Sequence, residues 1–131
     1  MRAQKGFNLL ELLAVVAIVS ILASMAIVFF QNHLAKAQVT EVLVLAGGLK
    51  TKVMTSLENS SCGNDIASGK YGIAMAGGMA PDCTITFTFN NTNASSALSS
   101  KTIGLDVLSN GTLKKNADTD VDSKYLPKAI D

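Results

Sequence analysis

The sequence FNLLELLAVVAIVSILASMAIVFF, from Phe7 to Phe30, is a long apolar stretch that decides how the chain is organised. As an α-helix with a rise of about 1.5 Å per residue it would extend roughly 36 Å, which is enough to cross a hydrocarbon core of about 30 Å. Asn8, two serines and one charged residue, Glu11, interrupt it. A carboxylate inside a membrane span costs about 2.5–3.5 kcal/mol on insertion scales. A simple anchor has no use for Glu11, so we expect this residue to serve another purpose.

The six residues before Phe7, MRAQKG, are basic and end in a small residue, Gly6. A secretory signal peptide has instead a short apolar region followed by a small-residue cleavage site. No such site follows the apolar run here, so cleavage after Gly6 would leave the whole apolar segment on the mature chain. The sequence KGFNLLEL, from Lys5 to Leu12, resembles the processing motif of type IV prepilins.

The resemblance to type IV prepilins implies a defined course of processing and assembly. In that family a dedicated peptidase cuts after the glycine, and the new amino terminus is methylated. Residues 1–6 would then be the leader, with the cut between Gly6 and Phe7 and the methyl group on Phe7. The family glutamate corresponds to Glu11, whose carboxylate would meet the amine of Phe7 on a neighbouring subunit in a filament, where each charge compensates the other. The alternative is a tolerated membrane carboxylate, either neutral or reaching toward the interface.

Composition limits the function classes of this chain of 131 residues, which has room for one modest globular domain beside the apolar segment. It carries 11 basic and 10 acidic side chains, and loss of the two basic leader residues would leave a net charge of −1. A nearly neutral chain is not a general nucleic-acid binder. It also has little charge to keep copies apart, which suits self-association.

The segment 31–58 continues the helical pattern, so we expect one long helix from Phe7 to about Leu57. Its first half, 7–30, is the transmembrane and filament-core helix, and its second half is amphipathic and belongs to a globular head, 31–131. The second half carries an apolar stripe at helical spacing, formed by Val39, Val42, Leu43, Ala46, Leu49, Val53, Met54 and Leu57. This stripe must be covered by the chain that follows Cys62.

The rest of the head predicts a small antiparallel sheet. Residues 59–82 are rich in Gly and Ala and are interpreted as an irregular connection, with 71–75 as a candidate short strand. Residues 84–89 alternate three threonines with Ile85, Phe87 and Phe89, which favours a strand with its aromatic side toward the helix.

The remaining alternating segments complete this sheet. Residues 101–108 and 112–115 flank Asn110-Gly111, the preferred two-residue hairpin turn. The predicted fold is α+β, with the sheet and tail in 83–131 and three to four strands packed on the helix, as in the pilin fold that the resemblance implies.

The two cysteines, Cys62 and Cys83, favour a disulfide, because their number is even and the chain must leave the cytoplasm. Two free buried thiols are the alternative. The bond would staple the helix-to-sheet connection, and it would contribute roughly 3 kcal/mol in the chain-entropy model. With one histidine and no C-x-x-C pair, the chain has no redox motif or zinc-site spacing.

Two polar clusters are further candidates for binding. Asp118, Asp120 and Asp122 resemble the opening of a calcium loop, but its central glycine and terminal glutamate are absent. We therefore expect a solvated acidic loop and no metal. A DNA-binding patch could form from Lys101, Lys114, Lys115, Lys124 and Lys128. The chain has no tryptophan and only two tyrosines to stack bases, so a solvated charged surface is preferred.

Taken with the resemblance, these features indicate the major pilin of a Gram-negative bacterium. It would enter the inner membrane as a single-pass precursor, meet the prepilin peptidase and the assembly machinery, and polymerise through its N-terminal helix into an extracellular filament of many copies. The filament would support adhesion, twitching motility or DNA uptake. The alternatives are a minor pilin that binds DNA or a surface, and a type II secretion pseudopilin. His33 and Ser20 form no nucleophile constellation, so we expect neither enzymatic activity nor a cofactor.

Overall fold

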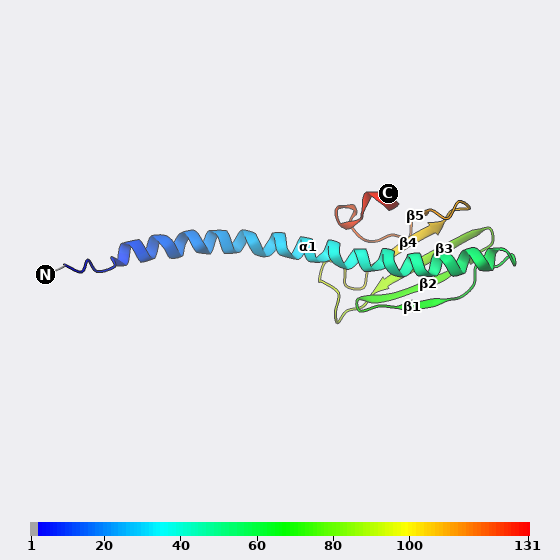
Figure 1. Ribbon diagram of the computed structural model, residues 1–131, viewed down its shortest axis with the longest axis horizontal. Helices are drawn as coiled ribbons and strands as arrows, with labels where there is room; N and C mark the ends of the chain where they lie inside the picture. Colours follow the sequence, from blue (N-terminus) through cyan, green and yellow to red (C-terminus); the bar gives the residue numbers. More distant parts are fainter. Residues whose placement is uncertain (1–2) are drawn as a thin grey trace. The chain divides into compact units, whose positions relative to one another are not determined.

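A computed structural model describes residues 3–131 and contains one long α-helix followed by a five-stranded sheet (Figure 1). The chain divides into two compact units with the boundary between Asn32 and His33. The elements are α1 (Leu9–Leu57), β1 (Ile66–Ser68), β2 (Gly72–Met79), β3 (Asp82–Phe89), β4 (Thr102–Val107), β5 (Leu113–Lys115) and two short 3-10 helices, η1 (Ser123–Tyr125) and η2 (Lys128–Ile130). The predicted α+β fold is confirmed.

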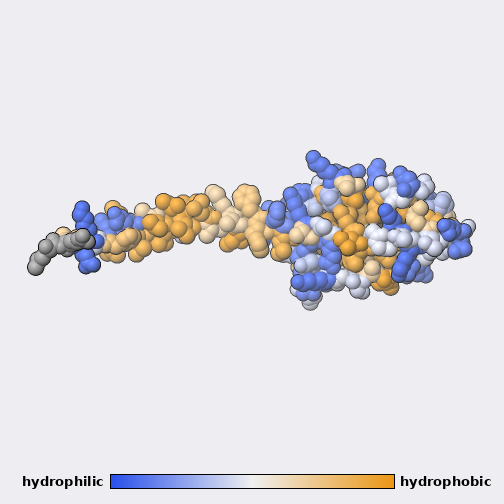
Figure 2. All heavy atoms as spheres, viewed as in Figure 1, coloured by the Kyte–Doolittle hydropathy of each residue, from blue (hydrophilic) through white to orange (hydrophobic). Residues whose placement is uncertain are grey.

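The part of α1 in the first unit exposes apolar side chains around its whole circumference. Between Leu9 and Phe30 every residue is exposed, including large leucine, isoleucine, valine and phenylalanine side chains, and Figure 2 shows this segment as a nearly unbroken hydrophobic surface. Within residues 3–131, α1 is the one helix that is long and apolar enough to cross a membrane. A continuous apolar surface of this size requires lipid or other protein to cover it.

The part of α1 in the second unit is amphipathic, as predicted. Its buried positions follow one face of the helix and comprise Ala35, Gln38, Val39, Val42, Ala46, Leu49 and Val53. Leu43, Met54 and Leu57 pack against the same core from its margin. The predicted stripe is therefore confirmed, and it is extended by Ala35 and by the polar residue Gln38.

The sheet is larger than predicted, with five antiparallel strands in the order β1-β2-β3-β4-β5 instead of three or four. The segment 59–82, interpreted as an irregular connection with a candidate short strand at 71–75, contains β1 and all eight residues of β2. The candidate strand is confirmed within β2, whereas β1 and the remainder of β2 were not predicted. Gly and Ala have low strand propensity, which explains the wrong prediction. Here small residues are required by packing: Ala74 is completely buried, and a Cβ at Gly72 would collide with the Thr88 carbonyl and the Phe87 ring.

Strand β3 forms the centre of the head, with its aliphatic and aromatic side chains buried as predicted. Ile85, Phe87 and Phe89 are buried, and the rings of Phe87 and Phe89 meet edge to face with centroids 4.8 Å apart. The alternating apolar residues of β4 join them in the same core, namely Ile103, Leu105 and Val107.

The turn between β4 and β5 differs from the predicted two-residue type. The Gly111 N–H donates to the Leu108 carbonyl at 2.8 Å, and the Leu108 N–H donates to the Thr112 carbonyl at 2.9 Å. Three residues therefore lie between the paired positions, and Gly111 has a φ of +78°. This is the three-residue hairpin loop in which glycine takes the left-handed position.

The predicted disulfide between Cys62 and Cys83 is present, with Cα atoms 5.3 Å apart. Cys62 lies just after the end of α1 and Cys83 lies in β3, and both are buried. The bond closes a sequence separation of 21 residues, which contains β1 and β2. It therefore links the end of the helix directly to the central strand of the sheet.

Replacement of Cys83 by serine should lower the free energy of unfolding of the head by about 2–4 kcal/mol, because the unfolded chain gains loop entropy. Urea denaturation of the full chain in neutral detergent micelles, followed by tyrosine fluorescence, would measure the change. Cys62→Ser should give the same loss, and Ser99→Ala provides a control at a serine remote from the bond. Identical urea midpoints for wild type and both cysteine variants would show that the bond does not stabilise the head.

Candidate functional site

The N-terminus of α1 is closed by a reciprocal pair of hydrogen bonds between Asn8 and the first helical turn. The Leu10 N–H donates to Asn8 Oδ1 at 3.3 Å, and the Asn8 N–H donates to Glu11 Oε2 at 3.3 Å. The first N–H groups of a helix have no intrahelical acceptor, so this capping box provides two of the missing partners. Asparagine is among the best residues at the N-cap position.

Glu11 therefore has a role within its own chain that the sequence interpretation missed. The spacing N-x-x-E at residues 8–11 was the signal that could have revealed it. The cap does not neutralise the charge of Glu11, because within residues 3–131 no basic side chain forms an ion pair with it. A carboxylate at a helix N-terminus is also favoured by the helix dipole.

The serines of the apolar segment have their hydrogen-bond partners within the helix. Ser20 Oγ donates to the Val16 carbonyl and Ser24 Oγ donates to the Ile21 carbonyl, each at 2.7 Å. Polar groups that face lipid without a partner cost several kcal/mol, and these bonds remove most of that cost. Glu11 thus differs from the two serines, because it is the residue of this segment that carries a charge.

The residues predicted as the processing site lie just before α1. Gly6 and Phe7 have no regular secondary structure, and Phe7 is 74% exposed. A Cβ placed on Gly6 would meet nothing within 4 Å. The peptide bond between them is therefore accessible. Met1 and Arg2, the first residues of the predicted leader, lie outside the described residues.

The acidic loop contains the three aspartates that were weighed as a possible calcium loop, Asp118, Asp120 and Asp122. Across the described part of the chain, no group of three or more His, Cys, Asp and Glu side chains is placed to hold a metal ion. In the predicted calcium loop, the Asp118 carbonyl accepts a hydrogen bond from Thr102 Oγ1 at 3.1 Å. The Asp122 carboxylate lies 3.6 Å from the Lys124 ammonium, with both side chains exposed.

Three of the five lysines predicted as a possible DNA-binding patch, Lys101, Lys115 and Lys124, make local polar contacts. Lys101 Nζ donates to the Asp120 carbonyl at 3.3 Å, and Lys115 pairs with the Asp131 carboxylate. Two of the five, Lys124 and Lys128, line one cavity. This distribution resembles local charge compensation more closely than a continuous nucleic-acid groove.

Three side chains of α1 fix the head by polar contacts that the sequence did not reveal. Gln38 is buried, and its Oε1 accepts the Ser95 N–H at 2.8 Å. Glu41 Oε1 accepts the Lys70 N–H at 2.6 Å at the turn between β1 and β2. Lys52 pairs with Asp65 at 3.2 Å. Because each pair is far apart in sequence, no local pattern predicts it.

These features define a class of protein. An exposed apolar helix whose first turn carries a capping carboxylate, and which continues into an α+β head, is typical of proteins whose apolar helix is covered by lipid or by other protein.

Comparison with known proteins then identifies the family. A sequence model described as "Pilin (bacterial filament)" matches residues 35–131, and one described as "Prokaryotic N-terminal methylation motif" matches residues 1–27. The chain belongs to the pilin family, which confirms the resemblance noted in the sequence.

Similar proteins extend over nearly the whole chain. A fimbrial protein of Moraxella nonliquefaciens is 40% identical over 152 aligned positions, which cover 99% of this chain and 98% of the relative. A type IV major fimbrial protein FimA of Dichelobacter nodosus is 33% identical over 153 positions, which cover 97% of this chain and 94% of the relative. The similarity therefore includes both the apolar helix and the head.

Proposed function

We propose that the chain is a structural subunit of a type IV pilus, held in the inner membrane by α1 and then polymerised with other copies into an extracellular filament. The observation that carries this proposal is the fully exposed apolar surface of α1 between Leu9 and Phe30. Lipid covers such a surface before assembly, and the same segments of other copies can cover it afterwards. The pilin match and the fimbrial relatives support this function.

The major subunit is favoured over a minor pilin or a secretion pseudopilin because relatives that align over 94% of their length are named major fimbrial proteins. Shearing filaments from cells and identifying their main component by mass tests this choice. A main component other than this chain would favour the minor-pilin alternative. Adhesion, twitching motility and DNA uptake are the activities that such a filament would serve, and each is measured by loss in a deletion strain.

We infer that residues 1–6 are a leader that a prepilin peptidase removes between Gly6 and Phe7, after which the amine of Phe7 is methylated. Support comes from the methylation-motif match over residues 1–27 and from the accessible, non-helical backbone at Gly6. Because α1 begins at Leu9, removal of the leader leaves the whole helix and its cap on the mature chain.

The mature subunit should therefore begin at Phe7, with a mass lower than that of the precursor by residues 1–6 and higher by one methyl group. Intact-mass measurement of sheared filaments checks this directly. Gly6→Leu should retain the leader, because the site requires a small residue. Ala3→Leu adds the same bulk away from the cut and should be processed normally. A leader retained on wild-type filaments would exclude this processing site.

For assembly, we propose that Glu11 pairs with the methylated amine of Phe7 on a neighbouring copy. In the separate subunit, the described contact of the Glu11 carboxylate is one backbone N–H of its own helix. A carboxylate has acceptor capacity for several further bonds, so the cap leaves room for a cationic partner. Charge-assisted bonds of this kind are about twice as strong as neutral ones, which would favour one axial register between copies.

A further inference from the structure

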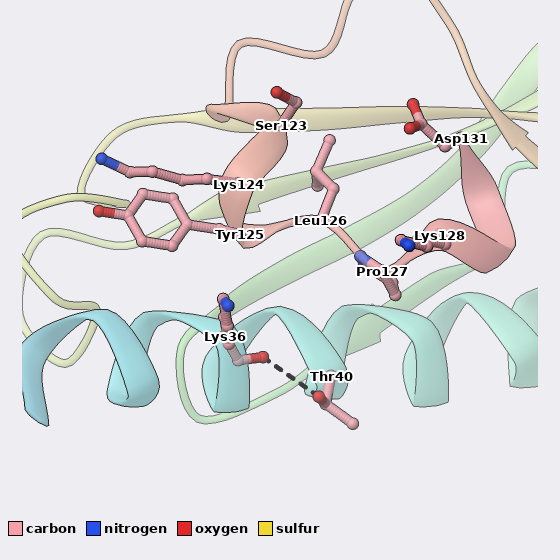
Figure 3. A pocket seen from close by; sticks show the side chains of 9 residues that line it. All are labelled: Lys36, Thr40, Ser123, Lys124, Tyr125, Leu126, Pro127, Lys128 and Asp131. Carbon is pink, nitrogen blue, oxygen red and sulfur yellow. Dashed lines mark hydrogen bonds between the residues drawn. The ribbon is translucent and has the colours of Figure 1, made fainter. Parts of the chain in front are cut away.

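The head carries a cavity of about 600 Å³, open to solvent, between α1 and the C-terminal segment that contains η1 and η2. Lys36 and Thr40 of α1 line one side, and residues 123–128 together with Asp131 line the other. Figure 3 shows the Lys36 side chain extending from α1 toward this C-terminal segment. The volume lies within the range of about 300–1,000 Å³ that is typical of small-molecule sites.

Three lysines, Lys36, Lys124 and Lys128, are among the residues that line the cavity. The acidic side chain in the lining, that of Asp131, is already paired with Lys115, and this contact lowers the pKa of the Asp131 carboxyl. Within residues 3–131, Lys36 and Lys128 form no ion pair. The lining therefore carries three lysines and one aspartate, and the side chain of that aspartate is paired with Lys115, which lies outside the lining.

Lys124 is held in its charged form by its surroundings. Its ammonium lies 4.8 Å from the centre of the Tyr125 ring and 3.6 Å from the Asp122 carboxylate. A hydrogen bond with the Tyr125 hydroxyl, followed by the charges of Tyr125 and Asp122, raises the pKa of Lys124. Asp122 offsets part of the positive charge of Lys124. Among the described residues, the lining lysines without an ion pair are therefore Lys36 and Lys128.

The remaining lining combines hydroxyl groups with an apolar wall. Thr40 Oγ1 donates to the Lys36 carbonyl at 3.1 Å, which leaves its lone pairs free to accept. Ser123 adds a second hydroxyl, and Tyr125, Leu126 and Pro127 provide the apolar wall. Tyr125 is fixed in place, since it is 8% exposed. Sugar rings present apolar faces and hydroxyl groups, so they match this combination.

We propose that this cavity binds a sugar that carries an anionic group, either a sugar acid or a sugar phosphate. The ammonium groups of Lys36 and Lys128 hold the anion, the hydroxyls of Thr40 and Ser123 bond the sugar hydroxyls, and the apolar wall contacts the ring. Single-stranded nucleic acid fits less well, because it requires an extended groove with several stacking rings. Another cavity of the head, of about 470 Å³ beside β2, has no charged residue in its lining.

Isothermal titration of the full chain in neutral detergent micelles tests the proposal with four probes: glucuronate, glucose 6-phosphate, glucose and inorganic phosphate. Both anionic sugars should bind, and glucose and inorganic phosphate should bind at least about tenfold more weakly, since each lacks one part of the recognised chemistry. Lys36→Gln and Lys128→Gln should each weaken binding of the anionic sugars by about tenfold, as expected for loss of one charge-assisted contact.

Lys114→Gln is the matched control, because it removes the same charge from an exposed position outside the cavity. It should leave the affinity unchanged, and circular dichroism should show that all three variants keep the wild-type fold. Equal weakening by Lys114→Gln would overturn the proposal in favour of non-specific charge attraction. Equal affinity for glucose, or no binding of either anionic sugar at about 10 mM, would also overturn it. Binding of a short single-stranded DNA, without binding of the anionic sugars, would overturn the proposal as well.

Discussion

Replacement of Glu11 by glutamine should abolish filaments while leaving the subunit processed and held in the membrane. The amide keeps the size of the side chain and can still accept the Asn8 N–H, so the cap of α1 is preserved. The negative charge is lost, and the amine of Phe7 on the neighbouring copy would be buried without a partner. Removing one member of a buried ion pair costs about 3–5 kcal/mol, enough to reverse a weak subunit contact.

The yield of sheared filaments, compared with the amount of processed subunit in the membrane, measures this effect. Glu11→Ala should behave in the same way and should enter the membrane more easily than wild type, because the cost of the carboxylate disappears. Glu58→Gln is the matched control, since it removes one carboxylate from an exposed position after α1 and should leave the yield unchanged.

Asn8→Ala distinguishes capping of α1 from the proposed charge pairing of Glu11. It removes the side-chain cap, at a cost of about 0.5–2 kcal/mol of helix stability, but keeps the charge of Glu11. Filaments should therefore still form. Normal yield from both Glu11 variants would mean that the carboxylate only caps its own helix. Loss of filaments in Asn8→Ala with normal yield in Glu11→Gln would point to the same conclusion.

Replacement of Phe87 by alanine should lower the free energy of unfolding of the head by about 3–5 kcal/mol. Phe87 is completely buried in β3, the central strand of the sheet, and its ring contacts that of Phe89. Gly72 lies so close to the ring that its backbone forms part of the wall, which limits how far the core can relax. Since the cost of a cavity depends on such relaxation, the effect should lie toward the upper end of the range.

Urea denaturation of the full chain in detergent measures this change, with Thr88→Ala as the control. Thr88 is the next residue of the same strand but is exposed, and its loss should change stability by less than about 0.5 kcal/mol. A midpoint for Phe87→Ala that coincides with that of Thr88→Ala would show that the packing of the sheet on α1 is not as described.

Several features follow from local sequence alone, because each depends on residues close together in the chain. The apolar run after Phe7 and the stripe from Val39 onward predicted a helix that the structure places at Leu9–Leu57. The alternation from Thr84 to Phe89 predicted β3 and its buried face. In each case a periodic pattern fixes which side chains share a face, and burial of that face provides most of the stabilisation.

Other features were decided by contacts between distant segments. The glycine and alanine residues of β2 have weak intrinsic preference for a strand, and they form one because β3 offers a partner and the core admits only small side chains at Gly72 and Ala74. The bond between Gln38 and Ser95 likewise has no local signature.

The proposed N-terminal site and the proposed binding cavity differ in the same respect: the first depends on local sequence and the second on tertiary contacts. The proposed processing motif and Glu11 lie within six residues of one another, so a local sequence pattern was enough to predict both. The cavity in the head joins residues 36–40 to residues 123–131. In the sequence, nothing distinguishes its three lysines from the other surface charges. Folding of the chain brings Lys36 and Lys128 into the lining of the same cavity. Local periodicity determines helices, strands and short motifs, whereas a site assembled from opposite ends of the chain depends on tertiary packing.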